Sequence, residues 1–92
     1  MAFVLANTVD GKKITTYTAS LANTGTAAAD VRATVYIPNV QRVIAVLGVV
    51  RKDANNAGVV VNGIVSPNGV DIIAQSVPAG AITHIDITVL AI

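Results

Sequence analysis

Residues 30–37 read DVRATVYI and alternate strictly between polar and apolar side chains. Successive side chains of an extended strand point to opposite faces, so such alternation predicts a half-buried β-strand. Pro38 ends the stretch, because proline has no amide hydrogen to give to a sheet. The residues predicted to face inward are Val31, Ala33, Val35 and Ile37.

The same alternation appears at two other places in the chain, residues 13–21 and residues 81–92. Both are therefore predicted to be strands with one buried and one solvated face. In the first, the hydroxyl side chains fall opposite the apolar ones. The predicted inward residues are Tyr17, Ala19 and Leu21 in the first stretch, and Ile85, Ile87, Val89 and Ala91 in the second.

Residues 40–50 differ, because both faces of this predicted strand are apolar. A strand of this kind needs a cover on each side, from a second layer of the fold or from another subunit. Gly48 inside it is typical of a bulge. One predicted face holds Val43, Ala45, Leu47 and Val49, and the other holds Ile44, Val46 and Val50.

Turn signals separate the remaining segments. Asp10-Gly11 predicts a hairpin between residues 2–9 and 13–21, and residues 66–69 (SPNG) predict a turn between strands at 59–65 and 70–75. Asn62-Gly63 is a rival turn within residues 59–65. Residues 77–80 form a further turn, residues 51–58 are predicted to be an exposed loop, and residues 26–29 are a candidate helical turn.

These elements predict one domain over residues 1–92, an all-β fold with about seven strands in a compact antiparallel β-sandwich or barrel. The composition agrees, with 53% hydrophobic and only 12% charged residues, against about a quarter charged in ordinary soluble domains. A chain this short buries only about 60 to 65% of its unfolded surface. Without cysteine for disulfides, we expect it to gain stability by forming a homo-oligomer.

The residue types that carry catalysis are sparse. His84 and Asp86 share a strand face and offer a hydrogen-bonded pair or two metal ligands, but the chain has no second histidine and no cysteine to complete a site. We therefore expect no enzyme activity, no cofactor and no bound metal. The chain has only six lysine and arginine residues and a net charge of +1, and these residues do not form the dense basic stripe of a nucleic-acid binder. The longest apolar run, residues 43–50, is too short for a membrane helix, and no signal peptide is visible.

The whole chain resembles the small structural proteins of tailed bacteriophage virions, especially head-decoration or cement proteins. The resemblance lies in a short cysteine-free β chain rich in Ala, Thr, Val and Asn, in the loop at residues 53–56 (DANN), and in the closing strand at residues 77–90 (VPAGAITHIDITVL). It implies a protein synthesised in the host cytoplasm and located in the virion. There it would bind and stabilise a major-capsid lattice, often as a trimer, with residues 1–9 as a candidate strand-donating arm.

Two alternatives remain open at this point. One is another virion component, such as a tail, head-completion or fibre-base protein. The other is a small glycan-binding β-sandwich, for which the chain offers no tryptophan and only three aromatic residues. The residues predicted to contact a capsid protein, another virion protein or a second copy are Phe3, Val4, Tyr36, Ile44, Val46 and Val50.

Overall fold

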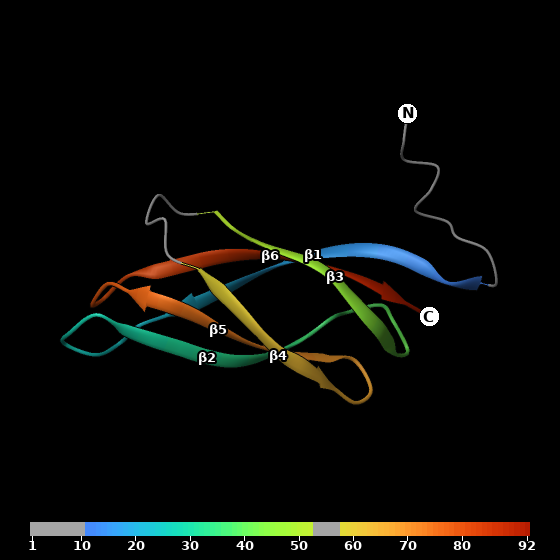
Figure 1. Cartoon of the computed structure of the whole chain (residues 1–92), viewed down its shortest axis with the longest axis horizontal. Helices are drawn as coiled ribbons and strands as arrows, with labels where there is room; N and C mark the ends of the chain where they lie inside the picture. Colours follow the sequence, from blue (N-terminus) through green and yellow to red (C-terminus); the bar gives the residue numbers. More distant parts are fainter. Residues whose placement is uncertain (1–10, 53–57) are drawn as a thin grey trace.

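The structure, a computed structural model, describes residues 11–52 and 58–92. These residues form two three-stranded antiparallel sheets that pack face to face (Figure 1). Sheet A has the order β1-β6-β3, and sheet B has the order β2-β5-β4. The bounds are β1 (Lys13–Ala22), β2 (Ala29–Tyr36), β3 (Val43–Arg51), β4 (Val59–Val65), β5 (Gly69–Val77) and β6 (Ile82–Ala91).

The predicted all-β sandwich is confirmed, with six strands in the described residues instead of about seven. The strand and hairpin predicted for residues 2–9 lie outside the described residues. Residues 26–29 contain no helical turn, and Ala29 already belongs to β2. The described residues contain no helix that could span a membrane.

The core lies between the two central strands, β5 and β6. β6 alternates as its sequence predicts, with Ile85, Ile87, Val89 and Ala91 buried. In β5, for which no inward face was predicted, Val70, Ile72 and Ala74 are buried. Burial of these aliphatic groups is the main driving force of the fold, at about 25 cal/mol per Å² of apolar surface. The most deeply buried members are Val70, Ile72, Ala74, Val77, Ile85, Ile87, Val89 and Ala91.

Strand β3 departs from the predicted alternation. Its register against β6 shifts between Val43 and Ala45 and again between Val46 and Gly48. Each β-bulge adds one residue and reverses which side chains face inward. The predicted grouping of side chains into two faces is therefore wrong: Val46 packs against the core with Val43 and Val49, whereas Leu47 is 53% exposed.

Bulges and contacts between the sheets explain two further differences. Asn62-Gly63 makes no turn; it marks a bulge inside β4, where the register shifts between Val61 and Gly63. Arg51, predicted to open an exposed loop, ends β3 and is half-buried. Its guanidinium donates hydrogen bonds to the Thr83 hydroxyl and to the Gln75 carbonyl oxygen, and so ties sheet A to sheet B.

Candidate functional site

The outer face of sheet A carries a ladder of hydrogen bonds between polar side chains of β1 and β6. Thr16 and Thr88 lie directly opposite each other, with hydroxyl oxygens 2.8 Å apart. The Thr18 hydroxyl donates to the Asp86 carboxylate at 2.5 Å. In this ladder each side chain satisfies its cross-strand neighbour, as such pairs do in stable sheets.

His84 and Asp86 lie on this face as predicted, but each is bonded to a different neighbour. The Nδ1 atom of His84 lies 2.9 Å from the Ser20 hydroxyl. Asp86 is bonded to Thr18, and one of its oxygens lies 3.8 Å from the ammonium group of Lys52. Among residues 11–52 and 58–92, no three His, Cys, Asp or Glu side chains come together as a metal-binding group.

The outer face of sheet B has one ion pair at its centre. Arg32 of β2 donates to both oxygens of Asp71 of β5, at 2.7 and 3.3 Å. Hydrogen bonding from Arg32 holds the pKa of Asp71 below its usual range, and Asn62 of β4 lowers it further. Arg32, Asp71 and Asn62 thus connect all three strands of this sheet, and the lowered pKa keeps the Asp71 carboxylate ionised.

Tyr36 covers a glycine next to this ion pair. Gly69 lies opposite Tyr36 in the register of β2 and β5. A Cβ placed on Gly69 would come within 3.1 Å of the Tyr36 ring and 3.0 Å of the Thr34 methyl group. Gly69 is therefore buried, while the ring itself is 58% exposed. Together these residues make a small aromatic and polar patch.

The edge strands β3 and β4 present the largest group of exposed apolar side chains. They lie on the same side of the sandwich and contact each other across the two layers. β4 has the sequence VVVNGIV and no charged residue. We call the exposed apolar side chains of these two edge strands the β3–β4 flank. Val50 lies opposite Asp86 on the outer face of sheet A, and Val60 lies opposite Ile73 on sheet B. The members of the flank are Leu47, Val50, Val60, Val61, Ile64 and Val65.

The backbone amide and carbonyl groups of an uncharged, apolar edge strand can pair with a strand of another chain, and natural proteins usually protect such edges. Here the bulges in β3 and β4 interrupt continuous backbone pairing. The flank is therefore better suited to side-chain contacts than to a simple extension of either sheet.

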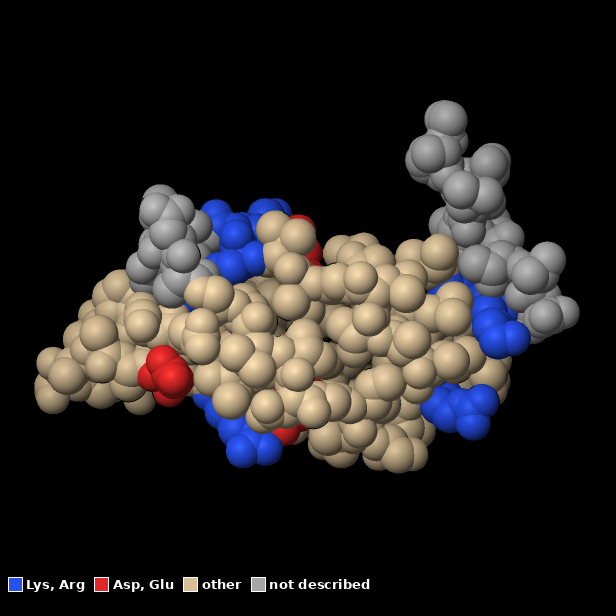
Figure 2. Space-filling model, in the orientation of Figure 1, with Lys and Arg blue, Asp and Glu red and all other residues tan. Residues whose placement is uncertain are grey.

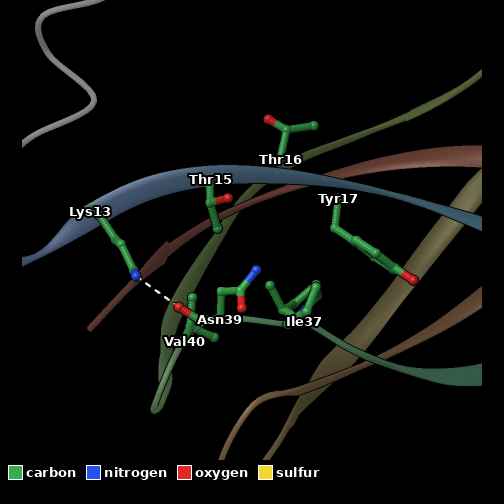
Figure 3. Close-up of a pocket in the computed structure, with 8 residues that line it drawn as sticks. Lys13, Thr15, Thr16, Tyr17, Ile37, Asn39 and Val40 are labelled. Carbon is green, nitrogen blue, oxygen red and sulfur yellow. Dashed lines mark hydrogen bonds between the residues drawn. The ribbon is translucent and has the colours of Figure 1, made fainter.

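A cavity of about 190 Å³ lies at the opposite side of the sandwich, beneath β1 (Figure 3). Thr15 points from β1 toward the loop that follows β2, whereas Thr16 points away from it. The Lys13 ammonium donates to the Asn39 carbonyl oxygen at 2.8 Å across the cavity mouth. Lys13, Thr15 and Tyr17 form one wall, and Ile37, Pro38, Asn39 and Val40 form the other.

The predicted interface residues do not form one surface. Tyr36 and Val50 are well exposed, on the outer face of sheet B and on the β3–β4 flank respectively. Val46 packs against the core, and Ile44 is half-buried. Phe3 and Val4 lie outside the described residues, as does the candidate arm at residues 1–9. Leu47 and the exposed residues of β4 were not among the predicted interface residues, although the uncharged run at residues 59–65 is visible in the sequence.

Comparison of the chain with protein-family models, with curated proteins and with solved structures found no match.

Proposed function

We propose that this protein is a non-enzymatic structural component that docks onto other protein subunits, and more specifically a decoration protein that reinforces a bacteriophage capsid lattice. The observation that carries the proposal is the β3–β4 flank. Large exposed groups of apolar side chains mark protein contacts more often than single exposed ones do. The flank is built from valine, leucine and isoleucine on two open sheet edges, without a charged residue in β4.

The rest of the described surface supports a scaffold role. Polar side chains on the outer face of sheet A are bonded to one another, as in the Thr16–Thr88 pair. The Arg32–Asp71 pair likewise satisfies its own charges. Binding to a lattice would add stability to a small domain by mass action. The virion assignment itself rests on the resemblance of the whole chain to phage head-decoration proteins.

The direct test is to identify where the protein resides. Phage particles produced by the source of this gene would be purified by density, separated into heads and tails, and analysed by quantitative mass spectrometry. We expect this chain in the head fraction in stoichiometric proportion to the major capsid protein. Its absence from particles would overturn the proposal, and enrichment in tails would assign it to a different virion component.

A second candidate function, glycan binding, is favoured by the patch around Tyr36. An exposed aromatic ring beside a carboxylate and an amide is a common way to hold a sugar, because the ring stacks on the apolar face of the sugar and the polar groups bind its hydroxyls. Asp71 and Asn62 supply such groups on the same sheet face. Binding on a glycan array that is lost in Tyr36→Ala but kept in Tyr17→Ala would favour this function.

A further inference from the structure

The flank opposite β3 and β4 has a different character, and β1 is its key element. In the described residues, β6 pairs with one side of β1 and no strand pairs with the other side. Alternate backbone amide and carbonyl groups of an edge strand point away from the sheet, where an extended peptide can pair with them. Its register with β6 runs without a bulge from Lys13 to Ala22, so its backbone is regular over ten residues.

The cavity lies directly beneath this edge, on the inner side of sheet A. Thr15 and Tyr17 line it from β1, opposite the buried Ile37. A strand added beside β1 would direct every second side chain to the inner side of sheet A, because side chains alternate along a strand. One of these side chains, next to residues 13–17, would reach the cavity. The cavity volume of about 190 Å³ exceeds that of a roughly 150 Å³ cavity that holds benzene. It therefore accommodates an aliphatic side chain.

Charge identifies the kind of segment that fits. Lys13 begins β1 and pairs with Ala91, which also pairs with Val43, so Arg42 lies at the same end of sheet A. Neither Lys13 nor Arg42 forms an ion pair with a carboxylate of the described residues. Figure 2 shows blue side chains at this end of the molecule, on the right.

The Lys13 ammonium is also held in place. It gives one hydrogen bond to the Asn39 carbonyl oxygen at 2.8 Å. An ammonium group has three donors, so two remain for a ligand. Asn39 is itself fixed in a left-handed backbone conformation, with φ of 63°. A carboxylate near the cavity mouth would meet a positioned cation instead of a freely moving one.

We propose that the open edge of β1 and the cavity beneath it form a binding site for an extended acidic segment of a partner protein. The segment pairs its backbone with β1, places an aliphatic side chain in the cavity and brings a carboxylate to Lys13 and Arg42. This site lies on the opposite side of the sandwich from the β3–β4 flank. It does not depend on the virion assignment.

The test uses the full chain and a defined probe. A capped ten-residue peptide, matched to the ten residues of β1, would carry threonine at every second position, with valine and aspartate taking turns at the positions between, so that valine and aspartate share one face of the strand. Titration followed by amide NMR should shift signals of β1 and of residues 37–40. A counterpart peptide with lysine in place of aspartate should bind more weakly. Equal binding of the two peptides, no binding at about 1 mM, or shifts confined to other strands would overturn the proposal.

Variants separate the charges from the cavity. Lys13→Gln and Arg42→Gln should each weaken binding of the acidic peptide about two- to five-fold, as expected for a solvent-exposed ion pair. Lys52→Gln is the matched control, since Lys52 lies near Asp86 away from this end, and should leave binding unchanged. Thr15→Leu would fill the cavity and should weaken both peptides. An unchanged affinity in Lys13→Gln and Thr15→Leu would contradict the site.

The chain's own N-terminal residues are the rival occupant of this edge. The protein contains no cysteine, so in an Ala6→Cys, Thr15→Cys double variant any disulfide formed on mild oxidation must join the two introduced cysteines, within one chain or between two copies. Binding of a separate partner segment predicts that most of the protein stays unlinked. Complete formation of an internal disulfide would show that the chain covers the edge itself. A disulfide-linked dimer would show that a second copy does so; either result would overturn the proposal.

Discussion

The polar ladder on β1 and β6 and the β3–β4 flank belong to the same small sandwich, yet they differ both in residue type and in how their side chains are paired. On the outer face of sheet A, threonine, serine, aspartate and histidine lie opposite one another and form hydrogen bonds across β1 and β6. On the flank, valine and leucine side chains remain exposed on strands whose outer edges have no neighbour in the described residues. The polar groups of the first surface have hydrogen-bond partners within the chain, whereas the apolar side chains of the second remain exposed to solvent. The difference lies in pairing as much as in composition.

The largest effect on stability should come from β6, a strand that carries core residues on one face and residues of the polar ladder on the other. Ile87 is fully buried and Thr88, the next residue, belongs to the polar ladder. Ile87→Ala should lower the free energy of unfolding by about 2 to 5 kcal/mol, because it removes buried methyl groups and leaves a cavity. Thr88→Ala should lower it by no more than about 1 kcal/mol. Urea denaturation checks both, and equal losses would mean that the ladder contributes as much as the core.

The second prediction concerns the flank. Val50→Lys and Val60→Lys place charge on exposed positions, 62% and 40% exposed respectively, and should change the free energy of unfolding by only about 0.5 kcal/mol. If the flank is a contact surface, self-association or lattice binding should fall about ten-fold or more, since the charge would have to be buried. Sedimentation velocity over a concentration series measures this effect.

Thr16→Lys is the matched control for the flank variants, because it adds the same charge to the polar ladder. We expect it to leave association unchanged. If the wild type and all three variants are monomeric and bind no particle, the flank is not a contact surface, and the proposed difference between the flank and the polar ladder is wrong.

The sequence predicted regular strands well and bulged strands poorly. The alternation in residues 30–37 and 81–92 gave the correct buried faces, because residues 31–36 pair without a shift with β5 and residues 82–91 pair without a shift with β1. In β3, Gly48 was correctly taken as a sign of a bulge. The first bulge, near Val43, has no comparable local signal, and it depends on the register with β6. Without that register, Val46 was placed with Val50 on one face.

The candidate sites were even less accessible from the sequence. The cavity joins residues 13–17 of β1 to residues 37–40, which are at least 20 positions away in the chain. The Arg32–Asp71 pair joins residues 39 positions apart. Such contacts follow from how the sheets are ordered, and an alternating pattern does not determine strand order. By contrast, His84 and Asp86 were correctly placed on one face because their relation is local to a single strand.

The third prediction tests the ion pair of sheet B by its pH dependence. Arg32 lowers the folded-state pKa of Asp71, while an unfolded aspartate titrates near pH 3.9. The pair therefore stabilises the fold fully above about pH 4, and this stabilisation is lost as the pH falls through the lowered folded-state pKa. In Asp71→Asn, stability should approach that of the wild type as the solution is acidified. In Arg32→Met, an NMR titration should show the pKa of Asp71 moving back toward its usual value.

The smallest effect should come from His84, on the polar ladder. Its hydrogen bond with Ser20 is exposed, so water can replace the lost partner when His84 is changed to alanine. The free energy of unfolding should change by no more than about 0.5 kcal/mol, and sedimentation should not change. Ser20→Ala is the companion variant, which removes the same hydrogen bond from the other side and should have the same small effect. If the ladder is only a solvated surface, neither variant alters metal content; a stoichiometric transition metal that is present in the wild type and lost in His84→Ala would instead make this face a binding site.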